Sequence, residues 1–200
     1  GIERYFQLAR CFRDEDQRGD RQPEFTQLDI EMSFVEREDV MDLVEDLFTR
    51  MVAQVVPHKH LLASPWPRLT YKEAMERFGK DNPDLRYGLE LKNITDLAAG
   101  SGFQVFESTV ARGGHVRGLN AKGLGDYSRK QIDELTEFVK QFGAKGLAYI
   151  ALPREGELRS SFSKFLSPER LQTILDRLEA QPGDLLLFVA DQPAVVFESL

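Results

Sequence analysis

Two neighbouring segments near the start of the sequence carry charged and amide side chains at every second position. Side chains alternate between the two faces of a β-strand, so positions of equal parity in residues 5–15 and 25–34 are expected to share a face. The odd-numbered positions bring together an arginine, an amide and three carboxylates, namely Arg13, Glu15, Gln27, Asp29 and Glu31. The small residues Ala9 and Cys11 would leave room above them. This face is therefore the first candidate for a binding site.

The residue types on this face suit a ligand that carries both a phosphate and a zwitterion. The guanidinium of Arg13 can hold a phosphate or a carboxylate through two hydrogen bonds, whereas the carboxylate of Asp29 can receive an ammonium group. Phe25, at the mouth of the loop between the segments, could stack on a base. The same alternation is also typical of the solvent face of an antiparallel sheet, and the pattern alone favours that plainer interpretation.

A hairpin and a helix are the elements that must position these side chains. Residues 5–15 and 25–34 have strand patterns and are separated by the polar residues 16–24, which predicts a hairpin with a long charged loop. The even-numbered positions would form an opposite, mostly apolar face that includes Phe6, Leu8, Leu28, Ile30 and Met32. A helix over about residues 38–55 has apolar residues at helical spacing and is expected to pack on this sheet.

Next along the chain, residues 58–68 contain Pro65 and Pro67 and are expected to form a connector. A capping box at Thr70 opens a short helix, which Gly79 closes.

The second half of the sequence predicts an α+β arrangement. We expect strands at 103–110, 115–121, 147–152, 157–166 and 184–190, and helices at 128–142 and 168–180. Small residues at 99–102 interrupt the pattern, so the chain is expected to form two globular units, 1–100 and 101–200.

Composition and charge exclude several classes of protein. The formal net charge of −7 argues against a protein that coats nucleic acid by charge alone, so any RNA contact must be local. The single cysteine, Cys11, excludes an internal disulfide framework and favours the reducing cytoplasm. No apolar run approaches the roughly 18 residues that span a bilayer, so no membrane partner is expected. Because the sequence lacks an initiator Met and opens directly on a strand pattern, it is expected to be a fragment.

Other residues that could do chemistry have plainer explanations. His58 and His60 have no third ligand nearby, so a solvated loop is favoured over a metal site and no metal ligand is assigned. The Arg-Gly-Gly-His segment at 112–115 is better explained by a hairpin turn than by a phosphate-binding loop. A basic set in the second half is favoured as a solvated surface over an RNA contact. Its members are Arg112, Arg117, Lys122, Arg129 and Lys130.

Residues 12–31 resemble a signature segment of a known enzyme family. Phe-Arg-Asp-Glu at 12–15, followed by Arg-Gln-Pro-Glu-Phe-Thr-Gln-x-Asp-x-Glu at 21–31, is similar to motif 2 of the class II aminoacyl-tRNA synthetases in its bacterial aspartyl form. Residues 80–86 resemble the segment that precedes the family's inserted domain, with Asn82 where the family more often has Lys. Residues 101–200 resemble that insertion, the GAD domain, in position and element order.

The resemblance implies a fold and a domain organisation. Residues 1–100 would be part of the antiparallel-sheet catalytic domain of a class II synthetase, with the motif 2 hairpin at 3–35. Residues 101–200 would be a two-layer α+β, GAD-like insertion domain that is truncated at its C-terminal end.

The resemblance also implies an activity. The family joins L-aspartate to ATP, which gives aspartyl-adenylate and pyrophosphate, and then passes the aspartyl group to the terminal adenosine of tRNA. The full-length protein would therefore be a cytoplasmic aspartate–tRNA ligase. Its partners would be L-aspartate, ATP and the acceptor end of tRNA, and it would form a homodimer.

Within motif 2 the resemblance assigns roles to individual residues. Arg13 would be catalytic and would hold both the α-phosphate of ATP and the carboxylate of aspartate. The ATP site would consist of Arg13, Asp14, Glu15, Gln22 and Phe25, with Phe25 stacked on the adenine. The aspartate site would consist of Arg13, Gln27 and Asp29, with Asp29 receiving the ammonium group. In the loop, Arg18 and Arg21 would contact tRNA.

Several parts of the family's machinery are not recognisable in the 200 residues. They are motif 1 with its dimer interface, the Gly-rich motif 3 with its second arginine, the anticodon-binding barrel, the aspartate loop and the acidic residues that hold the catalytic Mg²⁺. The chain alone is therefore expected to be inactive, with the Mg²⁺ ligands outside it. The alternative is a non-catalytic module, either a truncated paralogue or an isolated domain, that recruits tRNA or another protein.

Overall fold

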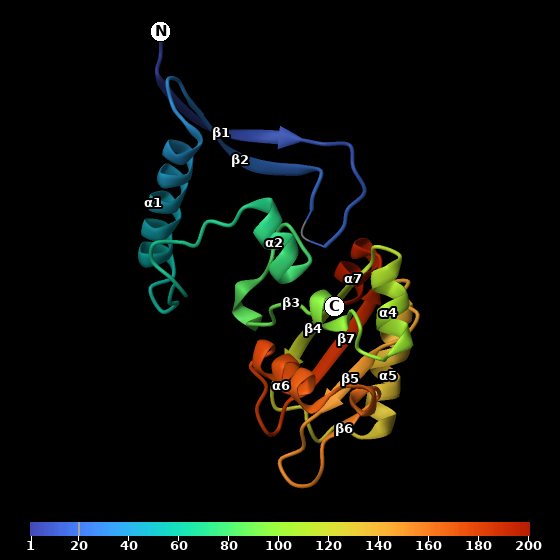
Figure 1. The fold of residues 1–200 in the computed structure, drawn as a ribbon. Coiled ribbons are helices and arrows are strands. Elements are labelled where there is room, and N and C mark those ends of the chain that lie inside the picture. Colours follow the sequence, from blue (N-terminus) through green and yellow to red (C-terminus); the bar gives the residue numbers. More distant parts are fainter. Residues whose placement is uncertain (20) are drawn as a thin grey trace. The chain divides into compact units, whose positions relative to one another are not determined.

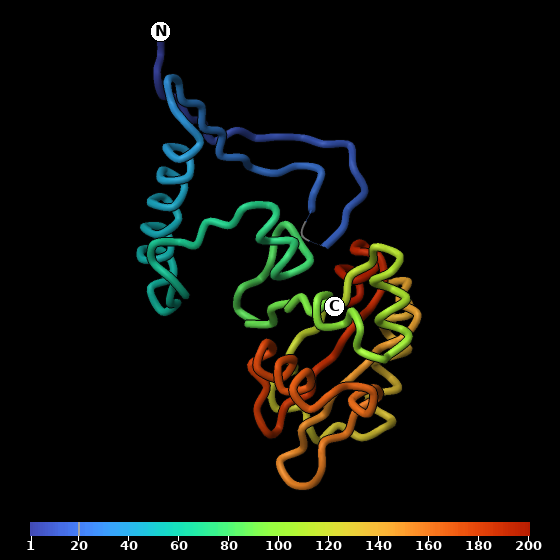
Figure 2. The backbone as a smooth tube through the Cα atoms, viewed as in Figure 1, coloured from blue at the N-terminus to red at the C-terminus, as the bar shows by residue number. Residues whose placement is uncertain are grey.

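A computed structural model describes residues 1–19 and 21–200, and it divides them into two compact units, Gly1–Pro67 and Arg68–Leu200. Figures 1 and 2 trace both units. The α+β class expected from the sequence is confirmed, with antiparallel strand pairing in both units.

The first unit consists of the expected hairpin and helix (Figure 1). Strands β1 (Arg4–Phe12) and β2 (Glu24–Met32) pair antiparallel, from Arg4 opposite Met32 to Phe12 opposite Glu24. Helix α1 (Arg37–Val55) follows, and a capping box between Glu36 and Asp39 satisfies backbone N–H groups at its start. The sequence pattern therefore predicted these elements correctly. The expectation that the helix packs on the hairpin sheet is wrong, because α1 makes few contacts with β1 and β2 and its residues Val44 and Met51 stay exposed.

The apolar surfaces of the first unit are not covered within this chain. Among its described residues, 1–19 and 21–67, none is fully buried. Phe6 on the apolar hairpin face is 70% exposed, and Met51 on α1 is 43% exposed. The connector after α1 is anchored locally, because the backbone N–H of Trp66 donates to Glu45 Oε1 at 2.8 Å.

The second unit is built on a five-stranded antiparallel sheet with the strand order β3-β4-β7-β5-β6. The strands are β3 (Lys92–Asn93), β4 (His115–Ala121), β5 (Ala148–Ala151), β6 (Arg159–Ser160) and β7 (Leu185–Asp191). Strand β7 lies in the centre, and its residues alternate between the two faces of the sheet. Leu186 and Phe188 belong to the core on one face, whereas Leu185 and Val189 point to the opposite face, where they belong to two separate apolar clusters.

Helices cover both faces of this sheet. They are α2 (Tyr71–Phe78), α3 (Thr95–Ala98), α4 (Gln104–Ala111), α5 (Arg129–Lys140), α6 (Pro168–Arg177) and α7 (Pro193–Ser199), with 3-10 turns η1 (Leu85–Tyr87) and η2 (Ser163–Phe165). Phe106 of α4 and Ile174 of α6 pack with Phe188, whereas Val139 of α5 and Val196 of α7 pack with Val189. The second unit thus has three layers instead of the two expected, because both faces of its central strand are apolar.

The boundary between the units lies at Pro67, and not near residue 100 as the sequence suggested. Strand β3 pairs with β4, placing Lys92 opposite Gly118, and Ile94 and Ala98 are buried in the core of the second unit. The small residues at 99–102, which the sequence analysis interpreted as a linker, instead follow the end of α3. There Gly100 and Gly102 adopt left-handed backbone conformations with φ of 63° and 79°.

Two strand predictions in the second unit are also wrong. Residues 103–110 form α4, because Phe103, Phe106 and Val110 recur at helical spacing and pack on one core. Residues 157–166 form only the two-residue strand β6, followed by η2. In addition, helix α7 follows β7, which no feature of the sequence pattern had predicted.

None of the helices in the described ranges is long and apolar enough to cross a membrane.

Candidate active site

The register of the hairpin places the polar side chains of both strands on one face. Cys11 lies opposite Phe25, Ala9 opposite Gln27, and Gln7 opposite Asp29. Directly opposed residues of antiparallel strands point to the same side, so Phe25, Gln27 and Asp29 share a face. The parity predicted from the sequence is confirmed for the residues within the strands.

Arg13 lies just beyond the end of β1, yet the strand pairing still positions it. Its backbone N–H donates to the carbonyl oxygen of Pro23 at 2.8 Å, which extends the ladder by one residue. Pro23 has no N–H group of its own, so the pairing stops there and the loop opens. The loop turns at Gly19, which has a φ of 57°, and the N–H of Arg21 donates to the carbonyl of Arg18 at 3.0 Å.

A cavity of about 400 Å³ lies where the loop leaves the strands, and it is lined by Arg13, Glu15, Arg21, Gln22 and Phe25. The guanidinium carbon of Arg13 lies 5.4 Å from the centroid of the Phe25 ring, a distance that allows a cation–π contact. Arg13 Nη1 lies 3.8 Å from Glu15 Oε1. The volume of this cavity lies within the range of small-molecule binding sites.

The charge of this cavity favours an anionic ligand. Two guanidinium groups, from Arg13 and Arg21, face one carboxylate, from Glu15. The ion pair between Arg13 and Glu15 is weak because their side chains are 61% and 51% exposed. A phosphate group can therefore replace Glu15 as the partner of Arg13 at little cost, and the aromatic face of Phe25 is suited to a base.

Asp29 forms a second group on the same face of the hairpin. Gln7 Nε2 donates to Asp29 Oδ2 at 3.0 Å, and Gln27 Nε2 donates to Asp29 Oδ1. Each carboxylate oxygen thus accepts a hydrogen bond from a neutral amide. The negative charge of Asp29 is oriented but not neutralised, which is what the binding of an ammonium group requires.

The structure brings together most of the residues that the sequence singled out. Four of the five ATP-site candidates line the cavity, and the exception, Asp14, is exposed on the loop. The two loop arginines differ, because Arg21 lines the cavity whereas Arg18 does not. Sequence reasoning gave no role to Gln7, although its odd position in the strand pattern was an available signal; its place opposite Asp29 became visible only with the register of the hairpin.

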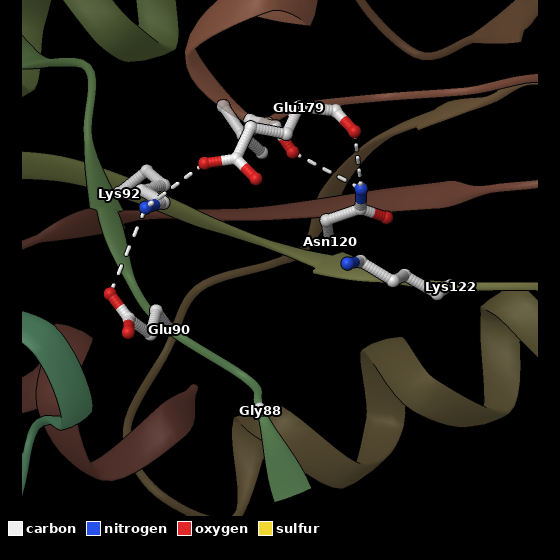
Figure 3. A pocket seen from close by; sticks show the side chains of 7 residues that line it. Gly88, Glu90, Lys92, Asn120, Lys122 and Glu179 are labelled. Carbon is white, nitrogen blue, oxygen red and sulfur yellow. Dashed lines mark hydrogen bonds and ion pairs between the residues drawn. The ribbon is translucent and has the colours of Figure 1, made fainter.

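A second pocket, in the Arg68–Leu200 unit, is small and its charges pair with one another (Figure 3). It has a volume of about 140 Å³, and Lys92 Nζ lies 3.7 Å from both Glu90 Oε2 and Glu179 Oε1. Asn120 Nδ2 donates to the carbonyl oxygens of Leu178, at 3.1 Å, and Glu179, at 3.4 Å. These contacts join α6 to the sheet, and the pocket is too small for a nucleotide.

The basic set named from the sequence of the second unit does not form one surface, because one of its members is buried. Arg117 is only 4% exposed, and its Nη1 donates to the carbonyl oxygen of Glu76 at 2.6 Å, so it is a core residue. Burial lowers the pKa of this guanidinium. Arg129 pairs with Asp133 on α5. The segment 112–115 joins α4 to β4 and is not a hairpin turn.

Among residues 1–19 and 21–200, no group of three His, Cys, Asp or Glu side chains could hold a metal ion.

Comparison with known proteins identifies the family of the chain. A family model described as tRNA synthetases class II (D, K and N) matches residues 1–197. The aspartate–tRNA(Asp/Asn) ligase of Symbiobacterium thermophilum is 60% identical over 200 residues, which are 100% of this chain and 33% of that protein. The aspartate–tRNA ligase of Ruminiclostridium cellulolyticum is 51% identical over 200 residues, with the same coverage.

The chain thus spans about a third of the length of these curated relatives. The family model nevertheless covers nearly all of it, the hairpin site included. The chain belongs to the class II tRNA synthetases of the D, K and N group.

Proposed function

We propose that the full-length protein is an aspartate–tRNA ligase, and that the hairpin supplies part of its amino-acid activation site. One observation carries the proposal: a cationic, Phe-lined cavity and an oriented, charged carboxylate lie on one face of a single hairpin. The first suits ATP and the second suits the ammonium group of an amino acid. The names of the relatives favour aspartate as that amino acid and favour a ligase over a non-catalytic module.

In the first step a carboxylate oxygen of aspartate attacks the α-phosphorus of ATP. A new oxygen–phosphorus bond forms, the bond from the α-phosphorus to the bridging oxygen breaks, and pyrophosphate leaves. Arg13 would hold the α-phosphate and the attacking carboxylate, and its fixed positive charge would stabilise the charge that develops at phosphorus. A guanidinium stays protonated, so Arg13 does no acid–base work.

In the second step a hydroxyl of the terminal adenosine of tRNA attacks the acyl carbon of the adenylate. The new ester bond forms as the bond to AMP breaks. We assign the exposed Arg18 to the phosphates or base edges of the acceptor end. Because Arg21 lines the cavity, we propose that it contacts ATP as well as tRNA.

The remaining residues of the site would place the two substrates. Phe25 would stack on the adenine, with Glu15 and Gln22 along the nucleotide and Asp14 flanking them. Asp29 would receive the ammonium group of aspartate, with Gln27 beside it.

We also propose that the hairpin unit belongs to the catalytic domain and that most of the Arg68–Leu200 unit is the GAD-like insertion. We expect the full-length protein to be a homodimer that functions in the cytoplasm, where Cys11, the single cysteine of these 200 residues, would stay reduced.

Exchange of labelled pyrophosphate into ATP by the full-length protein tests the proposed function. Exchange should depend on L-aspartate. It should be at least about a hundredfold slower with L-lysine or L-asparagine at equal concentration, because neither has the side-chain carboxylate of aspartate and the polar groups of the site that bind it would stay unpaired. Exchange that is supported equally by lysine or asparagine would refute aspartate as the substrate. Absence of exchange with every amino acid would refute the ligase.

A further inference from the structure

We propose that Gln7 is a positioning residue for aspartate recognition, acting through Asp29. This inference rests on the proposed function, in which Asp29 receives the ammonium group of the substrate. Gln7 does not need to touch the substrate. It holds the carboxylate that does.

The geometry gives Gln7 a contact of its own. Its Nε2 donates to Asp29 Oδ2 at 3.0 Å, whereas Gln27 donates to the other oxygen, Oδ1. Among the residues that the structure describes, these two glutamines supply the hydrogen bonds to the Asp29 carboxylate. Neither amide can replace the other, because each binds a different oxygen.

Two donors on different oxygens fix the plane of the carboxylate. The terminal torsion of an aspartate is broad and has no sharp rotamer preference, so a carboxylate held at one oxygen can still rotate. Gln27 is two residues from Asp29 on the same strand, whereas Gln7 reaches it from β1. Gln7 therefore couples the orientation of Asp29 to the pairing of the two strands.

The chemical nature of Gln7 also matters. An amide is neutral, so it orients Asp29 and leaves its full negative charge for an ammonium ligand. A lysine or arginine at this position would pair with Asp29 and compete with the substrate. A glutamate would have the same shape but no donor, and its charge would repel Asp29.

The tests are Gln7→Ala and the isosteric Gln7→Glu in the full-length protein, assayed by pyrophosphate exchange. We expect the KM for aspartate to rise about tenfold in Gln7→Ala, the scale of one hydrogen bond to a charged group. It should rise at least as much in Gln7→Glu, while the KM for ATP stays within about twofold because the ATP cavity does not include Gln7. The matched control is Gln54→Ala, which removes an exposed glutamine from α1 and should leave both constants unchanged.

Asp29→Ala separates this inference from the proposed function. If Gln7 acts through Asp29, then Gln7→Ala should add no further rise in the KM for aspartate when Asp29 is already alanine. A normal KM for aspartate in Gln7→Glu, with a raised one in Asp29→Ala, would refute the role of Gln7 and leave the function intact. A full additional rise in the KM for aspartate in the double variant, Gln7→Ala with Asp29→Ala, would likewise refute the role of Gln7 and leave the function intact. A normal KM in Asp29→Ala would instead refute the proposed aspartate site itself. If Gln7→Ala fails to fold, the isosteric Gln7→Glu decides the question.

Discussion

The two units of this chain use apolar side chains in opposite ways. In the second unit Phe106, Phe162 and Phe188 are at most 1% exposed and pack ring against ring. In the described part of the first unit no side chain is fully buried, and Phe6 lies open on the hairpin. The candidate chemistry nevertheless lies in the first unit. Strand register thus aligns the candidate binding residues in the first unit, whereas the fully buried apolar residues among those described lie in the second unit.

The two long helices show the same contrast. Helix α5 buries Ile132 and Val139 at 2% and 6% exposure, whereas α1 leaves Val44 at 36%. Both sequences have apolar residues at helical spacing, so the pattern alone cannot show which stripe is covered in this chain.

The largest expected effect concerns the phenylalanine at the centre of the second unit. Phe188 packs edge-on against Phe162, and its ring fills the space that a side chain at Gly118 would occupy. Phe188→Ala should lower the free energy of unfolding by about 3–5 kcal/mol, as expected when a buried phenylalanine is truncated. Urea unfolding of the 200-residue chain, followed by circular dichroism, measures this.

Two exposed phenylalanines serve as controls for Phe188→Ala. Phe6→Ala in the hairpin and Phe138→Ala on the outside of α5 should each change the stability by less than about 1 kcal/mol, since both side chains are more than half exposed. A loss for Phe6→Ala as large as that for Phe188→Ala would contradict the difference between the units.

A smaller effect is expected at the buried Asp184, just before β7. Its carboxylate is held by Asn120 Nδ2 at 3.0 Å and by the backbone N–H groups of Gly123, at 3.0 Å, and Gln181, at 3.1 Å. Asp184→Ala removes the buried acceptor of three part-buried hydrogen bonds and should cost about 1–3 kcal/mol. The measurement is again urea unfolding, and an unchanged midpoint would show that water replaces the carboxylate.

The smallest effect is a dependence of stability on pH in the second unit. Burial raises the pKa of Asp184, but its hydrogen bonds outweigh burial, so the net pKa lies below its ordinary value. Hydrogen bonds from Arg177 likewise lower the pKa of Asp96. The unfolded pKa is about 3.9, so both contributions are fully present above about pH 4 and disappear as the pH falls through the lowered folded values.

Urea midpoints at pH 6 and pH 3 test this dependence. The midpoint should fall on acidification, and it should fall less in Asp184→Asn, which cannot gain that proton on unfolding. An equal fall in both proteins would show that Asp184 does not contribute.

The sequence predicted the hairpin well because a period of two and a fixed register leave little freedom. The same reasoning wrongly predicted a strand at residues 103–110. Phe103 and Val105 fit the alternation of a strand, but the buried residues Phe106 and Thr109 follow helical spacing. The glycines at 100 and 102 resembled a linker, because their role in ending α3 depends on backbone angles that composition does not reveal. The contact between Gln7 and Asp29 depends on register, so it could be recognised only once the pairing was known.

Arg13 and Arg18 offer the most direct test that the hairpin divides its work between amino-acid activation and tRNA contact. In the full-length protein, Arg13→Ala should slow aspartate-dependent pyrophosphate exchange at least about a hundredfold, the usual scale for removing a charge-stabilising donor. Arg18→Ala should leave exchange nearly unchanged and should slow the transfer of aspartate to tRNA, with greater sensitivity to salt. Equal losses of exchange in both variants would contradict this division. No loss in Arg13→Ala would contradict the assignment of the activation site to this hairpin.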